Sequence, residues 1–123
     1  WGDGSPIRDF IHADDVADGM ISIIEQGYNK PINLGSGKGV TIKEIAEAIA
    51  SNLSDECKII WDTSKPSGDK KRIMNTSRAE SIGIRPSISL NEGIKTTIEW
   101  YQKNADNLSK RYNAFTDKLY KRN

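Results

Sequence analysis

The chain has 123 residues, 36% hydrophobic and 28% charged, with a formal net charge of +1. That length supports one compact domain or one piece of a larger one. The near-neutral charge excludes a broad field for nucleic acid or an anionic membrane, and no apolar run approaches the roughly 20 residues that span a bilayer. A single cysteine excludes an internal disulfide framework and favours a cytoplasmic location. The start at Trp1, inside a glycine-rich turn, indicates a fragment of a longer protein.

The N-terminal part of the chain predicts a strand followed by a helix. Residues 8–12 partly alternate apolar and polar side chains, which is typical of a strand after a turn. Asp14 or Asp15 is then expected to cap a helix that runs to about Gln26. Gly27 is well placed to end that helix.

The next segment predicts a brief strand over residues 32–34, a glycine turn and an amphipathic helix. Thr41 and Glu44 form a capping box, and the apolar stripe behind it predicts a helix to Leu53. The glycine turn, residues 35–41, invites comparison with a phosphate-binding loop. Its spacing is G-x-G-x-G, however, so a tight strand-to-helix turn is the better interpretation.

The rest of the chain continues the alternation of strands and helices. The expected elements are a strand over residues 58–62, a polar loop over 63–71, a short strand over 72–75, a helical turn over 76–81, and a helix that begins at a second capping box formed by Ser89 and Glu92. Residues 104–123 are polar and basic but repeat apolar side chains at helical spacing, so they form either an extra helix or a solvated tail. The pattern indicates an α/β architecture with too few strands for a complete doubly wound sheet.

Two cationic points on a near-neutral chain predict binding of a small dianion such as a pyrophosphate. Arg8 follows the glycine turn and enters a strand, which would fix its guanidinium for bidentate phosphate contact. The second point is a loop that carries Lys65, Lys70, Lys71 and Arg72. On composition alone, ordinary solvated surface charge is the better interpretation, so the dianion site is a hypothesis at this point.

Other reactive side chains receive structural interpretations. His12 is the only histidine, and the two aspartates after it head a helix, so no metal site is expected. Cys57 has no base nearby in the sequence and, beside Ile59, is expected to be a packed thiol. No catalytic residue is assigned within the chain.

Three stretches carry a family pattern: WGDGSPIRDFIHADDVA over residues 1–17, NLGSGKGVTIKEIA over 33–46, and the segment 61–101 with its Lys-Pro-Ser-Gly loop and its Trp-Tyr end. Together they resemble the extended short-chain dehydrogenases, a family of NAD-dependent epimerases, dehydratases and reductases that act on nucleotide-sugars. The third stretch is most similar to the GDP-L-fucose synthase branch of that family.

The resemblance implies that the chain is the C-terminal fragment of a Rossmann-type nucleotide-sugar epimerase. Residues 1–103 would hold the last strands of the sheet and a small substrate-binding α/β lobe. It also implies that a nucleotide-sugar, with a GDP-sugar favoured, contacts Trp1, Arg8, Lys65, Ser67, Lys71 and Arg72. Ser67 stands where the family's K-P-D-G loop has an aspartate, so a hydroxyl replaces a charge.

By the same resemblance the full-length parent binds NAD or NADP, forms a homodimer, and supplies the missing N-terminal Rossmann half. The chain contains neither the family's G-x-x-G-x-x-G cofactor turn nor its Tyr-x-x-x-Lys pair. We therefore expect this fragment to bind no cofactor and to be inactive alone. The alternatives are a non-enzymatic nucleotide-sugar-binding or protein-interaction module, and a 4-epimerase or dehydratase for a different nucleotide-sugar.

Overall fold

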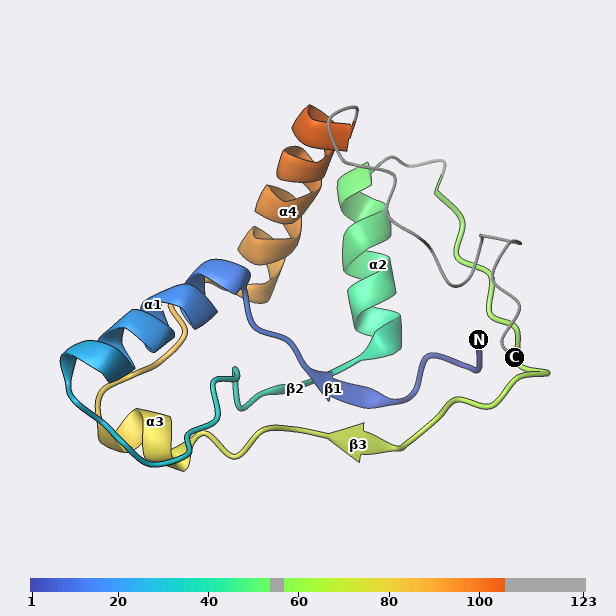
Figure 1. Ribbon diagram of the computed structural model, residues 1–123. Helices are drawn as coiled ribbons and strands as arrows, with labels where there is room; N and C mark the ends of the chain where they lie inside the picture. The colour runs from blue at the N-terminus through green and yellow to red at the C-terminus, as the bar shows by residue number, and fades with distance from the viewer. Residues whose placement is uncertain (54–56, 106–123) are drawn as a thin grey trace, which may run out of the picture.

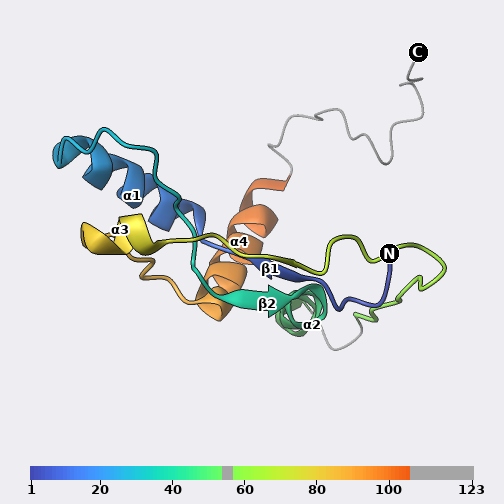
Figure 2. The same cartoon turned by 90° about the horizontal axis from the view of Figure 1, so that it is seen from below.

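The computed structural model describes residues 1–53 and 57–105. Within them the elements are β1 (Ile7–Asp9), α1 (Ala13–Glu25), β2 (Gly39–Thr41), α2 (Ile42–Leu53), β3 (Lys71–Arg72), α3 (Ser77–Ser81) and α4 (Leu90–Asn104). Helices α1 and α3 lie together at one end of the molecule, and the N-terminus lies beside the segment before β3 at the other (Figures 1 and 2). The α/β class predicted from the sequence is confirmed. All but the first two residues of the predicted tail, 104–123, lie outside the described residues.

Strand β1 lies at the centre of a three-stranded sheet with the order β2-β1-β3. It pairs antiparallel with β2 and parallel with β3, and the register places Arg8 opposite both Val40 and Arg72. Because directly opposed residues project from the same face of a sheet, these three side chains share one face. Helices α2 and α4 contact each other on one side of the sheet (Figure 1).

The ends of the helices follow local sequence signals. Gly27, with φ 62°, follows α1, and the amides of Gly27 and Tyr28 donate to the carbonyls of Ile24 and Ile23. This paired arrangement is the Schellman motif, in which a left-handed glycine closes a helix. Gly83 repeats it after α3 with φ 81°. The predicted stop at Gly27 is confirmed.

The predicted starts of α2 and α4 are also confirmed. The backbone N and Oγ1 of Thr41 donate to Glu44 Oε2 at 2.7 and 2.6 Å, and Glu44 N donates to Thr41 Oγ1 at 3.1 Å. These bonds, led by that from the Thr41 hydroxyl, hold the pKa of Glu44 below its ordinary value. At α4, Ser89 Oγ accepts a hydrogen bond from Glu92 N at 3.3 Å.

The predicted cap of α1 is wrong, because His12 caps the helix in place of Asp14 or Asp15. Nδ1 of His12 accepts a hydrogen bond from Asp14 N at 3.2 Å. Asp15 is 7% exposed and binds the segment before α4: its carboxylate accepts from Ser87 N at 2.8 Å, Ser87 Oγ at 2.9 Å and Ile88 N at 3.1 Å. Asp15 therefore joins α1 to the segment before α4, whereas the adjacent Asp14 contributes its backbone N–H to the cap of α1.

The strand predictions need larger corrections. Residues 32–34 and 58–62, both predicted as strands, have no regular secondary structure. Strands β1 and β3 each begin one residue earlier and end three residues earlier than predicted. The partner of β1 begins instead at Gly39, where a Cβ would lie 2.6 Å from Ile7 Cγ2. The pairing thus needs a glycine, which strand propensity disfavours.

The described residues bury very little apolar surface. Ala79, at 3% exposure, is the only buried hydrophobic side chain among them. On α1, Met20, Ile21 and Ile24 are 56%, 54% and 77% exposed, and α2 has no buried residue despite its apolar stripe. Cys57 is exposed as well, so the predicted packed thiol is wrong. None of the helices in the described residues combines the length and the hydrophobicity that spanning a bilayer requires.

Candidate functional site

The N-terminal glycine turn and the loop before β3 lie against each other at one end of the sheet (Figure 2). Gly2 N donates to the carbonyl of Asp62 at 2.8 Å, and Ile7 N donates to that of Lys70 at 2.9 Å. A Cβ on Gly2 would lie 2.4 Å from Ser67 Oγ, and the residue has φ +75°, so only glycine allows this approach. We call this region, residues 1–8 and 61–72, the turn–loop site.

Arg8 lies where the turn–loop site meets the sheet. Its Nη1 donates to the carbonyls of Ile7 and Asp69 at 2.8 and 2.9 Å, which uses both hydrogens of that nitrogen. Nε and Nη2 have no hydrogen-bond partner within residues 1–53 and 57–105. Nε–H and one Nη2–H point in parallel, so this edge of the guanidinium is able to bind a phosphate with two hydrogen bonds.

The cations of the loop are not equivalent. Arg72 forms an ion pair with Asp69, so much of its charge is balanced within the loop. Lys65 and Lys71 are exposed and form no ion pair with any described residue. An exposed ion pair contributes little to stability, and a dianionic ligand would compete with Asp69 for Arg72.

The structure brings most of the predicted binding residues to one end of the molecule. Trp1 is 80% exposed and precedes the glycine that contacts Ser67. Arg8 Nη2 lies 3.8 Å from the position that a Cβ would take on Gly68. In the sheet, Arg8 lies directly opposite Arg72. Contact of these side chains with a ligand stays a prediction.

Asp3 is a polar residue of the turn that the sequence analysis missed. Its Oδ1 accepts from Ser5 N at 2.9 Å, Ser5 Oγ at 2.7 Å and Ser67 Oγ at 2.9 Å. These bonds, led by the one from the Ser5 backbone, lower the pKa of Asp3 to about 2. The carboxylate is therefore ionised at neutral pH. The Asp-x-Ser spacing, which is typical of an Asx turn, was the available sequence signal.

Asp9 holds the glycine turn that invited comparison with a phosphate loop. Its Oδ1 accepts from Ser36 N at 2.8 Å and Ser36 Oγ at 2.5 Å, and its Oδ2 accepts from Gly37 N at 3.0 Å and Met74 N at 3.1 Å. Burial raises the pKa of Asp9, but the bonds from Ser36, Met74 and Gly37 outweigh it and lower the pKa. A carboxylate of the chain thus occupies the amides that an anion would need, in agreement with the tight-turn interpretation.

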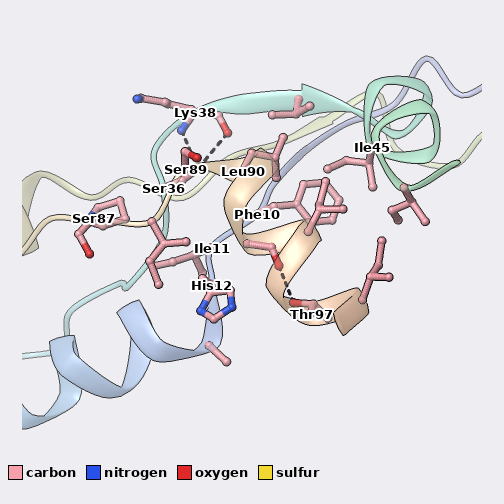
Figure 3. Close-up of a pocket in the computed structure, with 18 residues that line it drawn as sticks. Phe10, Ile11, His12, Ser36, Lys38, Ile45, Ser87, Ser89, Leu90 and Thr97 are labelled. Atoms are coloured by element: carbon pink, nitrogen blue, oxygen red, sulfur yellow. Dashed lines mark hydrogen bonds between the residues drawn. The ribbon is translucent and has the colours of Figure 1, made fainter. Parts of the chain in front are cut away.

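A cavity of about 680 Å³ lies between α2, α4 and the residues after β1 (Figure 3). Figure 3 shows Phe10 between Leu90 of α4 and Ile45 of α2. Most of its wall is apolar, and the principal lining residues are Phe10, Val40, Ile45, Ile49, Leu90, Ile94 and Ile98. His12 lines the cavity too. Its Nδ1 caps α1, and its Nε2 lies 3.3 Å from Thr96 Oγ1. No group of three metal-ligand side chains occurs among the residues described.

Residues 1–108 match the family of GDP-mannose 4,6 dehydratase. The chain belongs to this family.

The proteins that the chain is similar to include a protein named as a synthase, an epimerase and a reductase. The chain is 43% identical over 106 residues to a putative GDP-L-fucose synthase 2 of Arabidopsis thaliana, a match that covers 85% of the chain and 32% of the relative. A UDP-glucose 4-epimerase of Thermotoga maritima, solved with UDP-glucose, is similar with a TM-score of 0.76 and 27% identity over 85% of this chain and 34% of that one. A GDP-mannoheptose C4 reductase from Campylobacter jejuni, solved with NADP, is similar with a TM-score of 0.70 and 31% identity. That match covers 83% of this chain and 33% of the reductase chain.

These likenesses confirm the family resemblance that residues 1–17, 33–46 and 61–101 carry. They also confirm the Rossmann-type epimerase and reductase fold, because the solved relatives superpose over most of the chain. The chain spans about a third of the length of the relatives that it matches.

Proposed function

We propose that the chain is the nucleotide-sugar-binding part of an NAD(P)-dependent epimerase or reductase. The observation that carries this proposal is the open Nε and Nη2 edge of Arg8 inside the turn–loop site. A diphosphate bound to that edge would receive two parallel charge-assisted hydrogen bonds. Lys65 and Lys71 would add positive charge, and the exposed face of Trp1 would offer a surface for the base.

A GDP-sugar is the favoured ligand. The Arabidopsis relative, named as a GDP-L-fucose synthase, is 43% identical, whereas the epimerase solved with UDP-glucose is 27% identical. Ser67 offers a hydroxyl within the same loop, and its bond to Asp3 fixes where that hydroxyl lies. A UDP-sugar epimerase is the alternative, and binding measurements with both nucleotides separate the two.

The residues present do not fit NAD(P). The chain has no G-x-x-G-x-x-G turn, and the glycine turn before β2 has the amides of Ser36 and Gly37 bound to Asp9. Without a Tyr-x-x-x-Lys pair it also lacks the family's proton-transfer group. We infer that cofactor and catalytic residues belong to a further part of a longer protein, and that this chain alone turns over no nucleotide-sugar.

That further part would also cover the apolar faces left open here. The cavity beside Phe10 and the exposed side chains of Met20 and Ile24 are surfaces that folded proteins normally cover. About two thirds of the length of the relatives lies outside the match, which is enough chain for an N-terminal Rossmann half. We further expect a cytoplasmic homodimer.

The test is the affinity of the intact protein, with whatever flanking sequence its gene encodes, for GDP-mannose and UDP-glucose by isothermal titration calorimetry. Arg8→Ala should weaken binding about 30-fold, because a charge-assisted contact worth about 2 kcal/mol is lost. Arg85→Ala, on an exposed arginine four residues after the end of α3, is the matched control.

Equal affinity of wild type and Arg8→Ala would show that Arg8 does not contact the ligand. A wild type that binds neither nucleotide-sugar would favour the non-enzymatic module. Preferential binding of UDP-glucose would keep the site but reject the GDP-sugar assignment.

A further inference from the structure

We propose that Asp3 is a specificity-determining residue, which accepts a hydrogen bond on Oδ2 from a neutral donor of the ligand's nucleoside. The proposal rests on the proposed function, since it assigns a further contact to the turn–loop site. The donor is an O–H or N–H group, supplied either by the ribose hydroxyls or by the exocyclic amine of the base.

The first argument is the unequal use of the two carboxylate oxygens. Oδ1 of Asp3 accepts three hydrogen bonds, from Ser5 N, Ser5 Oγ and Ser67 Oγ, and is saturated. Oδ2 has no partner among the described residues, and the side chain is exposed. The turn uses only one acceptor atom, which the side-chain oxygen of an asparagine would also supply. The second oxygen is left for an external donor.

The second argument is position. Asp3 lies two residues from Trp1, which offers the exposed aromatic face. Ser67 links Asp3 to the loop through Oγ, and the next residue, Gly68, lies beside Arg8 Nη2. A ligand whose phosphate binds Arg8 and whose base stacks on Trp1 would therefore present its nucleoside near Asp3.

The third argument is electrostatic. The Asp3 carboxylate, whose pKa is lowered to about 2, is ionised at neutral pH, as is a diphosphate, so its presence here repels the phosphate. The charge favours binding only if it accepts a hydrogen bond, and a charged acceptor forms a stronger bond than a neutral one. If Asp3 only repels the phosphate, neutralising its carboxylate strengthens ligand binding. If Asp3 accepts a hydrogen bond from the nucleoside, neutralising it weakens ligand binding.

Asp3→Asn separates the two effects. The fixed Ser5 N–H keeps the amide oxygen in the place of Oδ1, so the amide nitrogen replaces Oδ2 and can no longer accept. The affinities of the intact protein for GDP, 2′,3′-dideoxy-GDP and IDP are measured by calorimetry, with melting curves to show that the variant folds. Asp18→Asn, which removes an exposed carboxylate on α1, is the control for charge.

We expect wild type to prefer GDP about tenfold or more over one of the two analogues, and Asp3→Asn to lose that preference by binding GDP more weakly. Loss of discrimination against the dideoxy analogue identifies the ribose, and loss against IDP identifies the base amine. Equal binding of all three by wild type, or unchanged ratios in the variant, overturns the role of Asp3 and leaves the proposed function intact. Absence of any nucleotide binding by wild type overturns both.

Discussion

We call the hydrogen bonds that the Asp9 carboxylate accepts from Ser36, Gly37 and Met74 the Asp9 clamp. These bonds predict how the variant Asp9→Asn behaves. In Asp9→Asn one carboxylate oxygen becomes an NH₂ group, which cannot accept a hydrogen bond. The side chain keeps a single acceptor atom, although backbone donors lie on both sides of it. Either Ser36 N, or both Gly37 N and Met74 N, must then lose their acceptor. A hydrogen bond to a charged group is worth about 1.5–3 kcal/mol, so the affected amides should exchange with solvent roughly 10 to 100 times faster.

Hydrogen exchange of the intact protein measures this effect residue by residue. Amides in the middle of α4 serve as the internal control, because their helical bonds do not involve Asp9. Asp9→Ala should accelerate exchange at Ser36, Gly37 and Met74 together, whereas Asp9→Asn accelerates one side only. Wild-type rates at all three amides in the asparagine variant would refute the clamp.

Further predictions concern stability. Gly2→Ala should lower the melting temperature and detach the loop at Ser67, since the residue has φ +75° and a Cβ would lie 2.4 Å from Ser67 Oγ; unchanged melting would contradict this packing. Asp15→Ala should reduce the free energy of unfolding in urea by about 3 kcal/mol because three hydrogen bonds are lost, whereas Asp18→Ala should change it little; equal effects would remove the special role of Asp15. Burial raises the pKa of Asp15, but the bonds from Ser87 and Ile88 outweigh it, so its folded pKa lies below the unfolded value of about 3.9. Its contribution is complete above that pH and is lost as the pH falls through the folded pKa, so the melting temperatures of wild type and Asp15→Ala should converge below about pH 4.

Helix boundaries were predictable because their determinants are local. The box of Thr41 and Glu44, the cap at Ser89 and the stop at Gly27 each depend on residues within one turn of the helix end. The cap of α1 was missed because Asp15 has a better partner 72 residues away, at Ser87. A sequence pattern carries no sign of such a competitor.

The strands and the site depended on distant contacts, and sequence patterns predicted them less well. Residues 58–62 have a strand-like composition, yet in the structure Asp62 uses its carbonyl to bind the N-terminal turn. Arg8 was predicted as a phosphate ligand from its place after a glycine turn. That its Nη1 also holds the loop at Asp69 depends on the pairing of β1 with β3. The ion pair of Asp69 with Arg72, in contrast, joins residues only three apart in the chain.

The loop before β3 is anchored to the turn mainly through its main-chain carbonyls, those of Asp62, Asp69 and Lys70. Any amino acid supplies a carbonyl, so substitutions along this loop leave these three anchors in place, whereas the two hydrogen bonds between Ser67 Oγ and Asp3 depend on the side chain. After gene duplication the loop side chains, and with them the ligand preference, can change while Arg8 on the central strand stays fixed. Libraries for altered specificity should therefore randomise Lys65 and keep Ser67 and β1 constant.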